Sequence, residues 1–165
     1  MDKVKLGNTD IHVTPVGLGV LTIGNTQMNL SLKEGAEIVR YAYEKGINLF
    51  DTAQYYETYP YIREAFKDID MSDDNPHRPV IASKCLDGSY EAMEFAIKEC
   101  LESLNIDKID IFKLHEVRQD PDWDSRAGAW QCLIDYRQRE PLKQSAFQPI
   151  ILMWWNEWQM YLNAI

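Results

Sequence analysis

The sequence lacks several features that would assign it to whole classes of protein. No run among its 165 residues reaches the roughly 18 apolar residues of a membrane span. The formal net charge is −9 and no cluster of basic residues offsets it, so a nucleic-acid backbone would be repelled. The opening MDKVKLGNTD has no apolar core of the kind a signal peptide needs. We therefore expect no nucleic-acid partner and no membrane association.

Cysteine is also scarce. Cys85, Cys100 and Cys132 are odd in number and lack the short paired spacing of a zinc site. We interpret them as reduced thiols in a cytoplasmic protein. The remaining composition, 45% apolar and 26% charged residues, is that of an ordinary globular domain with one core.

The order of short apolar runs predicts an α/β fold. KVKLGNTDIHVT, with Gly7 and Asn8 at its centre, predicts a β-hairpin, and the next apolar run predicts a buried strand from Val16 to about Leu21. The rest of the chain alternates between strands and helices. Strands are expected at INLFD, VIASK and KIDIFKLHE, and helices over about 32–45, 61–67, 89–105 and 123–137.

Two of these helices carry clear local signals. Ser31 and Glu34 form a capping box before the first helix, and Gly46 stops it. In the helix over 89–105 one apolar stripe is expected to contain Ala92, Phe95, Ala96, Cys100 and Leu104. The segment DIDMSDDNPHRP between the second helix and VIASK is acidic, and we expect it to be a solvated loop.

Alternating strands and helices imply right-handed βαβ units and a parallel sheet. The pattern fits both an open doubly wound sheet of the flavodoxin type and half of a (β/α)8 barrel. The chemistry of the residues at the strand ends has to distinguish between these two folds.

Three successive strands end in a titratable residue: Asp51, Lys84 and His115. Carboxyl ends of parallel strands form the functional face of α/β folds, and Tyr56 follows Asp51 by five residues. Each residue alone has a structural explanation, since Asp51 would serve as a helix cap, Lys84 as a rim charge and Tyr56 as packing. Together the four side chains supply an acid, a base partner, an ammonium group and an imidazole.

This set of side chains suits carbonyl chemistry. An ammonium beside a tyrosine stabilises the phenolate and lowers the tyrosine pKa, so Tyr56, with Lys84 held by Asp51, is expected to give its proton to a carbonyl oxygen. His115 would orient or polarise that carbonyl, and the hydride would have to come from a cofactor. A metal-dependent barrel hydrolase would need His and carboxylate ligands at several strand ends, and among the histidines only His115 is placed there.

The motifs GLGVLTIG, GINLFDTAQYY, VIASK and LNIDKIDIFKLHE resemble the aldo/keto reductase family in order and spacing, over Lys3 to about Gln138. The resemblance implies the amino-terminal half of a TIM (β/α)8 barrel with an N-terminal β-hairpin, using NADPH or NADH to reduce a small carbonyl substrate. It implies that Asp51, Tyr56, Lys84 and His115 are the catalytic tetrad.

The resemblance also implies cofactor positions. The backbone at Gly19, Val20 and Leu21, together with Asp51, would lie near the nicotinamide ribose. This sequence departs from the family's habit in two places, because Glu57 follows Tyr56 where Gly is frequent, and Val20 stands where Thr is common.

A TIM barrel takes about 250 residues, so the resemblance accounts for about half of one. We expect residues 1–138 to form a partial aldo/keto reductase domain and residues 139–165 to be a tail of different origin. A half barrel leaves sheet edges and apolar faces uncovered, which favours self-association. The alternative function is an inactive or partner-dependent fragment.

The tail departs sharply from the family's expected fifth strand, and we predict that residues from about Arg139 are read out of frame. Met153, Trp154 and Trp155 have single codons, so the neighbouring frame must read Val-Val and then Glu, whose codon is completed by the first two bases of Asn156. With suitable third bases, the preceding residues permit KGTIKAIGISTHH in that frame. The alternative, an interfacial helix, lacks a basic polar face. Nucleotide sequencing tests this hypothesis, and a gene without a family-like continuation in that frame would contradict it.

Overall fold

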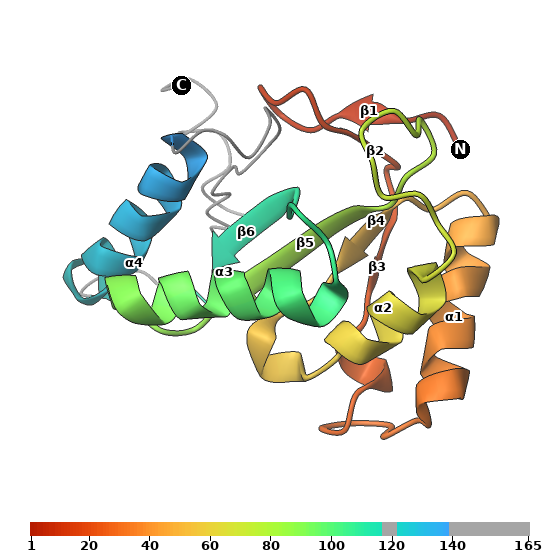
Figure 1. The fold of residues 1–165 in the computed structure, drawn as a ribbon, viewed down its shortest axis with the longest axis horizontal. Coiled ribbons are helices and arrows are strands. Elements are labelled where there is room, and N and C mark those ends of the chain that lie inside the picture. The colour runs from red at the N-terminus through yellow and green to blue at the C-terminus, as the bar shows by residue number, and fades with distance from the viewer. Residues whose placement is uncertain (117–121, 139–165) are drawn as a thin grey trace.

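The computed structural model describes residues 1–116 and 122–138; the predicted tail therefore lies outside the described residues. The elements, in chain order, are β1 (Val4–Lys5), β2 (His12–Val13), β3 (Gly17–Gly19), η1 (Leu21–Ile23), α1 (Leu32–Glu44), β4 (Leu49–Asp51), η2 (Gln54–Tyr56), α2 (Tyr59–Phe66), β5 (Val80–Cys85), α3 (Tyr90–Leu104), β6 (Ile111–Leu114) and α4 (Asp122–Gln138). They form a hairpin followed by a sheet with helices packed on it (Figure 1).

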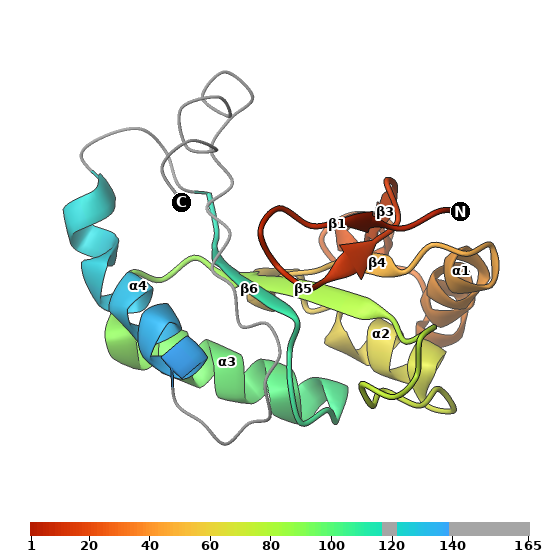
Figure 2. The same cartoon turned by 90° about the horizontal axis from the view of Figure 1, so that it is seen from above.

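The strand order selects between the two expected folds. The main sheet has the order β3-β4-β5-β6, and each neighbouring pair is parallel. A doubly wound sheet would reverse its strand order at a switch point and carry helices on both faces. Here α2 and α3 lie on one side of the sheet and the β1–β2 hairpin lies on the other (Figure 2). The predicted half barrel with an N-terminal hairpin is confirmed.

The two faces of the sheet follow from the period-two alternation of strand side chains. Phe50, Ile81 and Phe112 point to the helical side, where they are buried in the main core. Each such side chain stabilises the fold by roughly 1.5–3 kcal/mol when fully buried. On the inner side, Val80 and Ile111 form a second apolar cluster. That cluster includes the hairpin residues Ile11 and Val13, so the hairpin covers the amino-terminal part of the inner face.

Asn48 joins this hairpin to the sheet. Its side-chain oxygen accepts a hydrogen bond from the Thr14 backbone N–H at 2.6 Å, and its amide donates to the His12 carbonyl at 2.9 Å. Its own backbone N–H donates to Thr14 Oγ1 at 3.2 Å. Asn48 is buried, and its bond with the Thr14 N–H is made away from water, whereas its bond with the His12 carbonyl is part-buried.

We expect Asn48→Ala to lower the free energy of unfolding by roughly 2–3 kcal/mol, since it leaves the buried N–H of Thr14 and the part-buried carbonyl of His12 without these partners. Denaturant unfolding monitored by circular dichroism measures the loss. Gln27→Ala is the matched control, because it removes an exposed amide. Equal stability of the two variants would contradict this role of Asn48.

The local signals for α1 are confirmed, whereas several expected boundaries shift. Ser31 and Glu34 form the predicted capping box. The strand expected from Val16 to Leu21 is limited to Gly17–Gly19, because the chain turns into η1. The strand expected at KIDIFKLHE is shorter, Ile111–Leu114. The helix expected at 61–67 begins earlier, at Tyr59, with Pro60 in its first turn, where a missing N–H costs nothing.

The predicted stripe on α3 is wrong at Phe95. Met93, Ala96, Ile97, Cys100 and Leu104 are the buried residues of this helix, whereas Phe95 is 63% exposed. The buried face is thus rotated from the predicted one, because Met93 and Ile97 complete a continuous 3–4 spacing that excludes Phe95.

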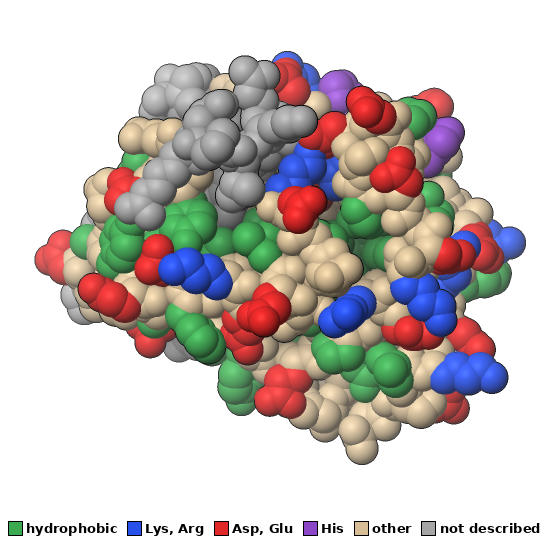
Figure 3. Space-filling view, viewed as in Figure 1, with side chains coloured by type: hydrophobic (Ala, Val, Ile, Leu, Met, Phe, Trp, Pro, Cys, Tyr) green, Lys and Arg blue, Asp and Glu red, His purple; other side chains and the backbone are tan. Residues whose placement is uncertain are grey.

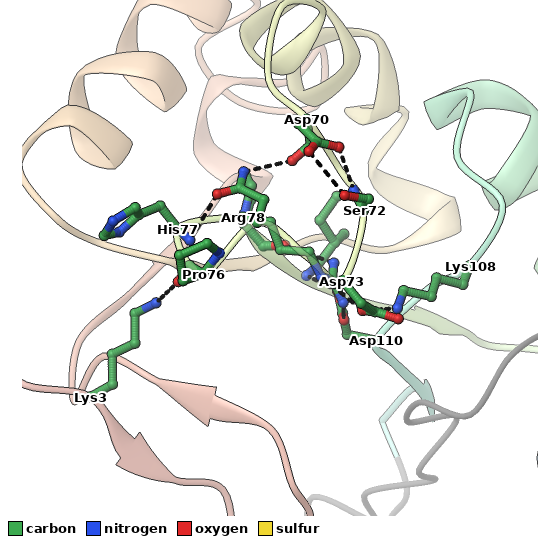
Figure 4. A network of polar contacts seen from close by, with 12 residues as sticks. Lys3, Asp70, Ser72, Asp73, Pro76, His77, Arg78, Lys108 and Asp110 are labelled. Carbon is green, nitrogen blue, oxygen red and sulfur yellow. Dashed lines mark hydrogen bonds and ion pairs between the residues drawn. The ribbon is translucent and has the colours of Figure 1, made fainter.

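The acidic loop before β5 is fastened by polar contacts rather than simply solvated (Figure 4). Arg78 forms an ion pair with Asp110 and lies 3.4 Å from Asp73, which also pairs with Lys108. Asp110 is buried, and its Oδ2 accepts the backbone N–H of Ile81 at 2.9 Å. The network links the loop to the amino-terminal ends of β5 and β6.

The hairpin is tied to the same loop. Lys3 Nζ donates to the Pro76 carbonyl at 2.8 Å, as Figure 4 shows. On the face carrying the helices, acidic and basic side chains alternate and do not separate by sign (Figure 3). Within the described residues, no helix is both long and apolar enough to cross a membrane.

Candidate active site

The predicted site residues gather at the carboxyl ends of the strands. Asp51 ends β4, Lys84 lies near the end of β5, and His115 directly follows β6. Tyr56 ends η2, on the segment that leaves β4. Lys84 and His115 are buried, whereas Asp51 and Tyr56 are half-buried. The structure thus brings all four predicted residues to one edge of the sheet.

Lys84 is the centre of this arrangement. Its ammonium forms an ion pair with Asp51 Oδ2 and donates to the Thr52 carbonyl at 2.8 Å. The same nitrogen lies over the ring of Tyr56, 4.7 Å from the ring centroid. Lys84 therefore touches the face of the phenol ring while its hydrogen bonds go to β4 and the residue after it.

Tyr56 and His115 are in direct contact. Tyr56 Oη lies 3.3 Å from His115 Nε2, and the two rings meet edge to face with centroids 5.4 Å apart. His115 Nδ1 is buried and has no hydrogen-bond partner among the described residues. A buried acceptor nitrogen without a partner is better tolerated than a buried N–H without one. This favours the tautomer with hydrogen on Nε2.

Local structure holds the Tyr56 turn in place. Gln54 Nε2 donates to Glu99 Oε2 of α3 at 2.6 Å, and the hydroxyls of Thr52 and Thr58 lie 2.8 Å apart on either side of the turn. Glu57 has a left-handed backbone, with φ 55° and ψ 29°. That conformation is easiest for glycine, which explains why Gly suits this position. The Glu57 side chain accepts a hydrogen bond from Asn25.

Lys113 is a site residue that the sequence-based prediction missed. Its Nζ lies 2.8 Å from Asp51 Oδ1, so Asp51 binds one ammonium on each carboxylate oxygen. Lys113 pairs in register with Lys84 across β5 and β6, and it is buried. The available signal was its position two residues before His115, which places both side chains on the same face of a strand.

The two ammonium groups control the charge of the carboxylate. Burial alone would raise the pKa of Asp51, but the charges of Lys113 and Lys84 outweigh it and hold that pKa below its ordinary value. Burial lowers the pKa of Lys113, assisted by Lys84 and opposed by Asp51. Asp51 is therefore ionised at neutral pH.

The imidazole and the phenol are shifted in opposite directions. Burial lowers the pKa of His115, and the charge of Lys84 adds to this effect, so the ring is neutral at pH 7. Burial raises the pKa of Tyr56, and the negative charges of Asp51 and Glu116 act in the same direction. The expected lowering of the Tyr56 pKa is therefore wrong for this structure, because burial and the two carboxylates raise that pKa. Tyr56 keeps its proton at neutral pH.

The three residues predicted near the cofactor lie at the carboxyl end of β3. Gly19 is exposed and pairs in register with Asp51, and a side chain added there would meet nothing within 4 Å. Val20 is fully buried and its N–H donates to the Asp51 carbonyl at 3.0 Å. Leu21 begins η1. An apolar residue fits at position 20 because its side chain is buried. Only the backbone of Val20 is then available for contacts with a cofactor.

Comparison with known proteins identifies relatives of this fold and sequence. A profile of the Aldo/keto reductase family matches residues 15–142. L-galactose dehydrogenase from Arabidopsis thaliana is 30% identical over 126 residues, which cover 71% of this chain and 40% of that protein. An uncharacterized oxidoreductase from Bacillus subtilis is 32% identical over 129 residues, covering 70% of this chain and 39% of that protein.

Solved structures support the fold. The holo form of an aldo-keto reductase from Bacillus halodurans superposes with a TM-score of 0.64 at 24% identity, covering 82% of this chain and 47% of that chain. An aldo/keto reductase from Brucella melitensis gives a TM-score of 0.65 at 23% identity, covering 82% and 49%. The chain spans about 40% of the length of the curated relatives it matches. A family match that covers most of the chain, on a sheet with the strand order of a barrel, shows that the protein belongs to the aldo/keto reductase family.

Proposed function

We propose that the protein reduces the aldehyde or ketone group of a small substrate, with NADPH or NADH as hydride donor and Tyr56 as general acid. The observation that carries the proposal is the contact between Tyr56 Oη and His115 Nε2 at 3.3 Å, beside an ammonium 4.7 Å from the Tyr56 ring centroid. A carbonyl oxygen placed between these two groups would face two hydrogen-bond donors. Donors aimed at the oxygen where charge develops stabilise the transition state of carbonyl reduction.

The residues present fit the reactive end of a nicotinamide cofactor. Gly19 leaves open space beside Asp51, and the Asp51 side chain is 37% exposed although both oxygens bind lysines. A ribose hydroxyl could donate to a carboxylate so placed, and the backbone of residues 19–21 would line the same side. When bound, the cofactor supplies the hydride that no side chain can provide.

Each of the four residues then has a distinct task. Tyr56 is protonated at neutral pH because its pKa is raised, so it can deliver a proton to the carbonyl oxygen as hydride reaches the carbonyl carbon. Neutral His115, with hydrogen on Nε2, donates to that oxygen and orients it. Lys84 lies over the Tyr56 ring and holds it in position, and Asp51 holds Lys84. The carbonyl gains one hydride and one proton, and the phenolate regains its proton from water.

A second candidate is a fragment that is inactive without a partner. The chain spans 40% of its Arabidopsis relative, and the described main sheet has four strands where a complete barrel has eight. Self-association through the inner face would be one way to complete it. The buried thiols Cys85, Cys100 and Cys132 form no disulfide, which suits the cytoplasmic location that we propose for either candidate.

The experiment measures binding and turnover by the purified full chain. Fluorescence titration with NADPH and NADH reports binding, and the loss of cofactor absorbance with a panel of small aldehydes and ketones reports reduction. The proposal predicts both, and analytical ultracentrifugation of the same sample reports whether the active species is a monomer or an assembly. Neither binding nor turnover in any assembly state would contradict the proposed activity and favour the inactive fragment.

A further inference from the structure

Asp51 is bound by two ammonium groups, and one carboxylate cannot neutralise both of their charges. Lys84 binds one of its oxygens and Lys113 the other. The exposed fractions of the two lysine side chains are 8% and 7%, so water screens them poorly. One carboxylate and two ammonium groups leave a single positive charge in excess on the inner face.

His115 is a neighbour on which both ammonium groups act. It follows Lys113 by two residues, directly after β6, and its backbone N–H donates at 2.8 Å to the carbonyl of Cys85, the residue after Lys84 in β5. The charged and titratable groups around it come from every packed element. They are Asp51 of β4, Tyr56 of η2, Lys84 of β5, Lys113 of β6, Glu116 after β6, and Arg126 of α4, which donates to the His115 carbonyl.

We propose that Lys113 is a positioning residue of this site, which holds the second oxygen of Asp51 and adds a buried positive charge that opposes protonation of His115. The proposal rests on the proposed carbonyl reduction and assigns a further residue to it. Burial and Lys84 already disfavour a charged imidazole, and Lys113 acts in the same direction. With Lys113 present, protonation of His115 would place a second excess cation on the inner face, which is unfavourable.

The neutral imidazole matters because of what it donates to the substrate. A neutral ring with hydrogen on Nε2 donates that hydrogen to the carbonyl oxygen while Tyr56 remains the proton source. If His115 were protonated, two acids of very different strength would compete for the same oxygen. Lys113 would thereby separate the two roles.

The test is a proton NMR titration of the histidine rings in the full chain without cofactor or substrate. The chain has three histidines, and a His115→Gln sample assigns the signal of interest. In Lys113→Met the His115 pKa is expected to rise, because a cation has been removed. In Lys113→Arg it is expected to stay at the value of the unsubstituted chain. Lys98→Met, which removes an exposed lysine on α3, is the matched control.

Asp51→Asn provides a second, opposite test if Lys113→Met folds poorly. Removing the anion leaves both ammonium groups unopposed, so the His115 pKa is expected to fall further. Where turnover is measurable, the acid limb of the pH profile of kcat/KM should move to higher pH in Lys113→Met. In Lys113→Arg it should lie at the pH of the unsubstituted chain. A purely structural role of Lys113 would change the rate without moving the acid limb. An unchanged His115 titration in folded Lys113→Met would overturn the proposal. If the His115 pKa shifts as predicted but the chain reduces no carbonyl compound, the effect of the Lys113 charge is supported and the proposed activity is contradicted.

Discussion

The Tyr56→Phe protein is expected to bind NADPH as the unsubstituted chain does and to reduce carbonyl compounds at least about 100-fold more slowly. Phenylalanine keeps the ring on which Lys84 lies, at 4.7 Å, and removes only the hydroxyl next to His115. General acid catalysis is typically worth about 100- to 10,000-fold, and the loss should appear in kcat, because the proton is delivered only in the transition state. Steady-state kinetics with the aldehyde that is reduced fastest measures it.

Tyr55→Phe is the matched control, since it removes the hydroxyl of the neighbouring tyrosine, which is 65% exposed. It should keep the rate of the unsubstituted chain. Equal losses in the two variants would show that the change acts on the turn rather than on proton transfer, and full activity in Tyr56→Phe would remove Tyr56 from the mechanism.

The second large effect is on stability. Arg78→Met is expected to lower the free energy of unfolding at neutral pH by roughly 3–5 kcal/mol, because it leaves a buried carboxylate without its cation. Asp110 is 3% exposed, and Arg78 binds both of its oxygens. Arg63→Met, an exposed arginine on α2, should cost little. Urea unfolding of the three proteins measures the differences.

The pH dependence of this loss follows from the pKa of Asp110. Burial raises that pKa above its ordinary value, although Arg78 opposes the shift. A carboxyl whose pKa is raised by folding stabilises the folded state at low pH, and this contribution is lost as the pH rises. Without Arg78 the shift should be larger, so the difference between Arg78→Met and the unsubstituted chain should shrink toward acid pH. The double substitution Arg78→Met/Asp110→Asn should recover part of the loss at neutral pH, and a loss that does not vary with pH would contradict this explanation.

Local and periodic signals predicted much of the fold and the positions of the tetrad. The capping box at Ser31 depends on residues three apart, and Asp51, Lys84 and His115 could be placed because each follows an apolar run that must be a buried strand. Both kinds of signal depend on neighbours in the sequence. Tertiary contacts therefore change the structures that these signals predict only a little.

Contacts between distant segments could not be predicted in the same way. Arg78 and Asp110 lie 32 residues apart, so the acidic loop seemed only solvated. Lys113 was missed because a charged residue within an apolar strand gives no sign of the carboxylate it meets 62 residues away. The direction of the Tyr56 pKa shift depends on burial and on the carboxylates near the ring, and neither is encoded by spacing.

Transfer of hydrogen from the cofactor to the substrate carbon tests the central claim most directly. The full chain is incubated with NADPH or NADH carrying deuterium at both C4 positions and with a small aldehyde, and mass spectrometry examines the alcohol. The proposed function predicts an alcohol with one deuterium on its carbinol carbon, formed by the unsubstituted chain and by Tyr55→Phe and strongly reduced in Tyr56→Phe. An alcohol without deuterium, or no alcohol from a chain that binds the cofactor, would contradict it.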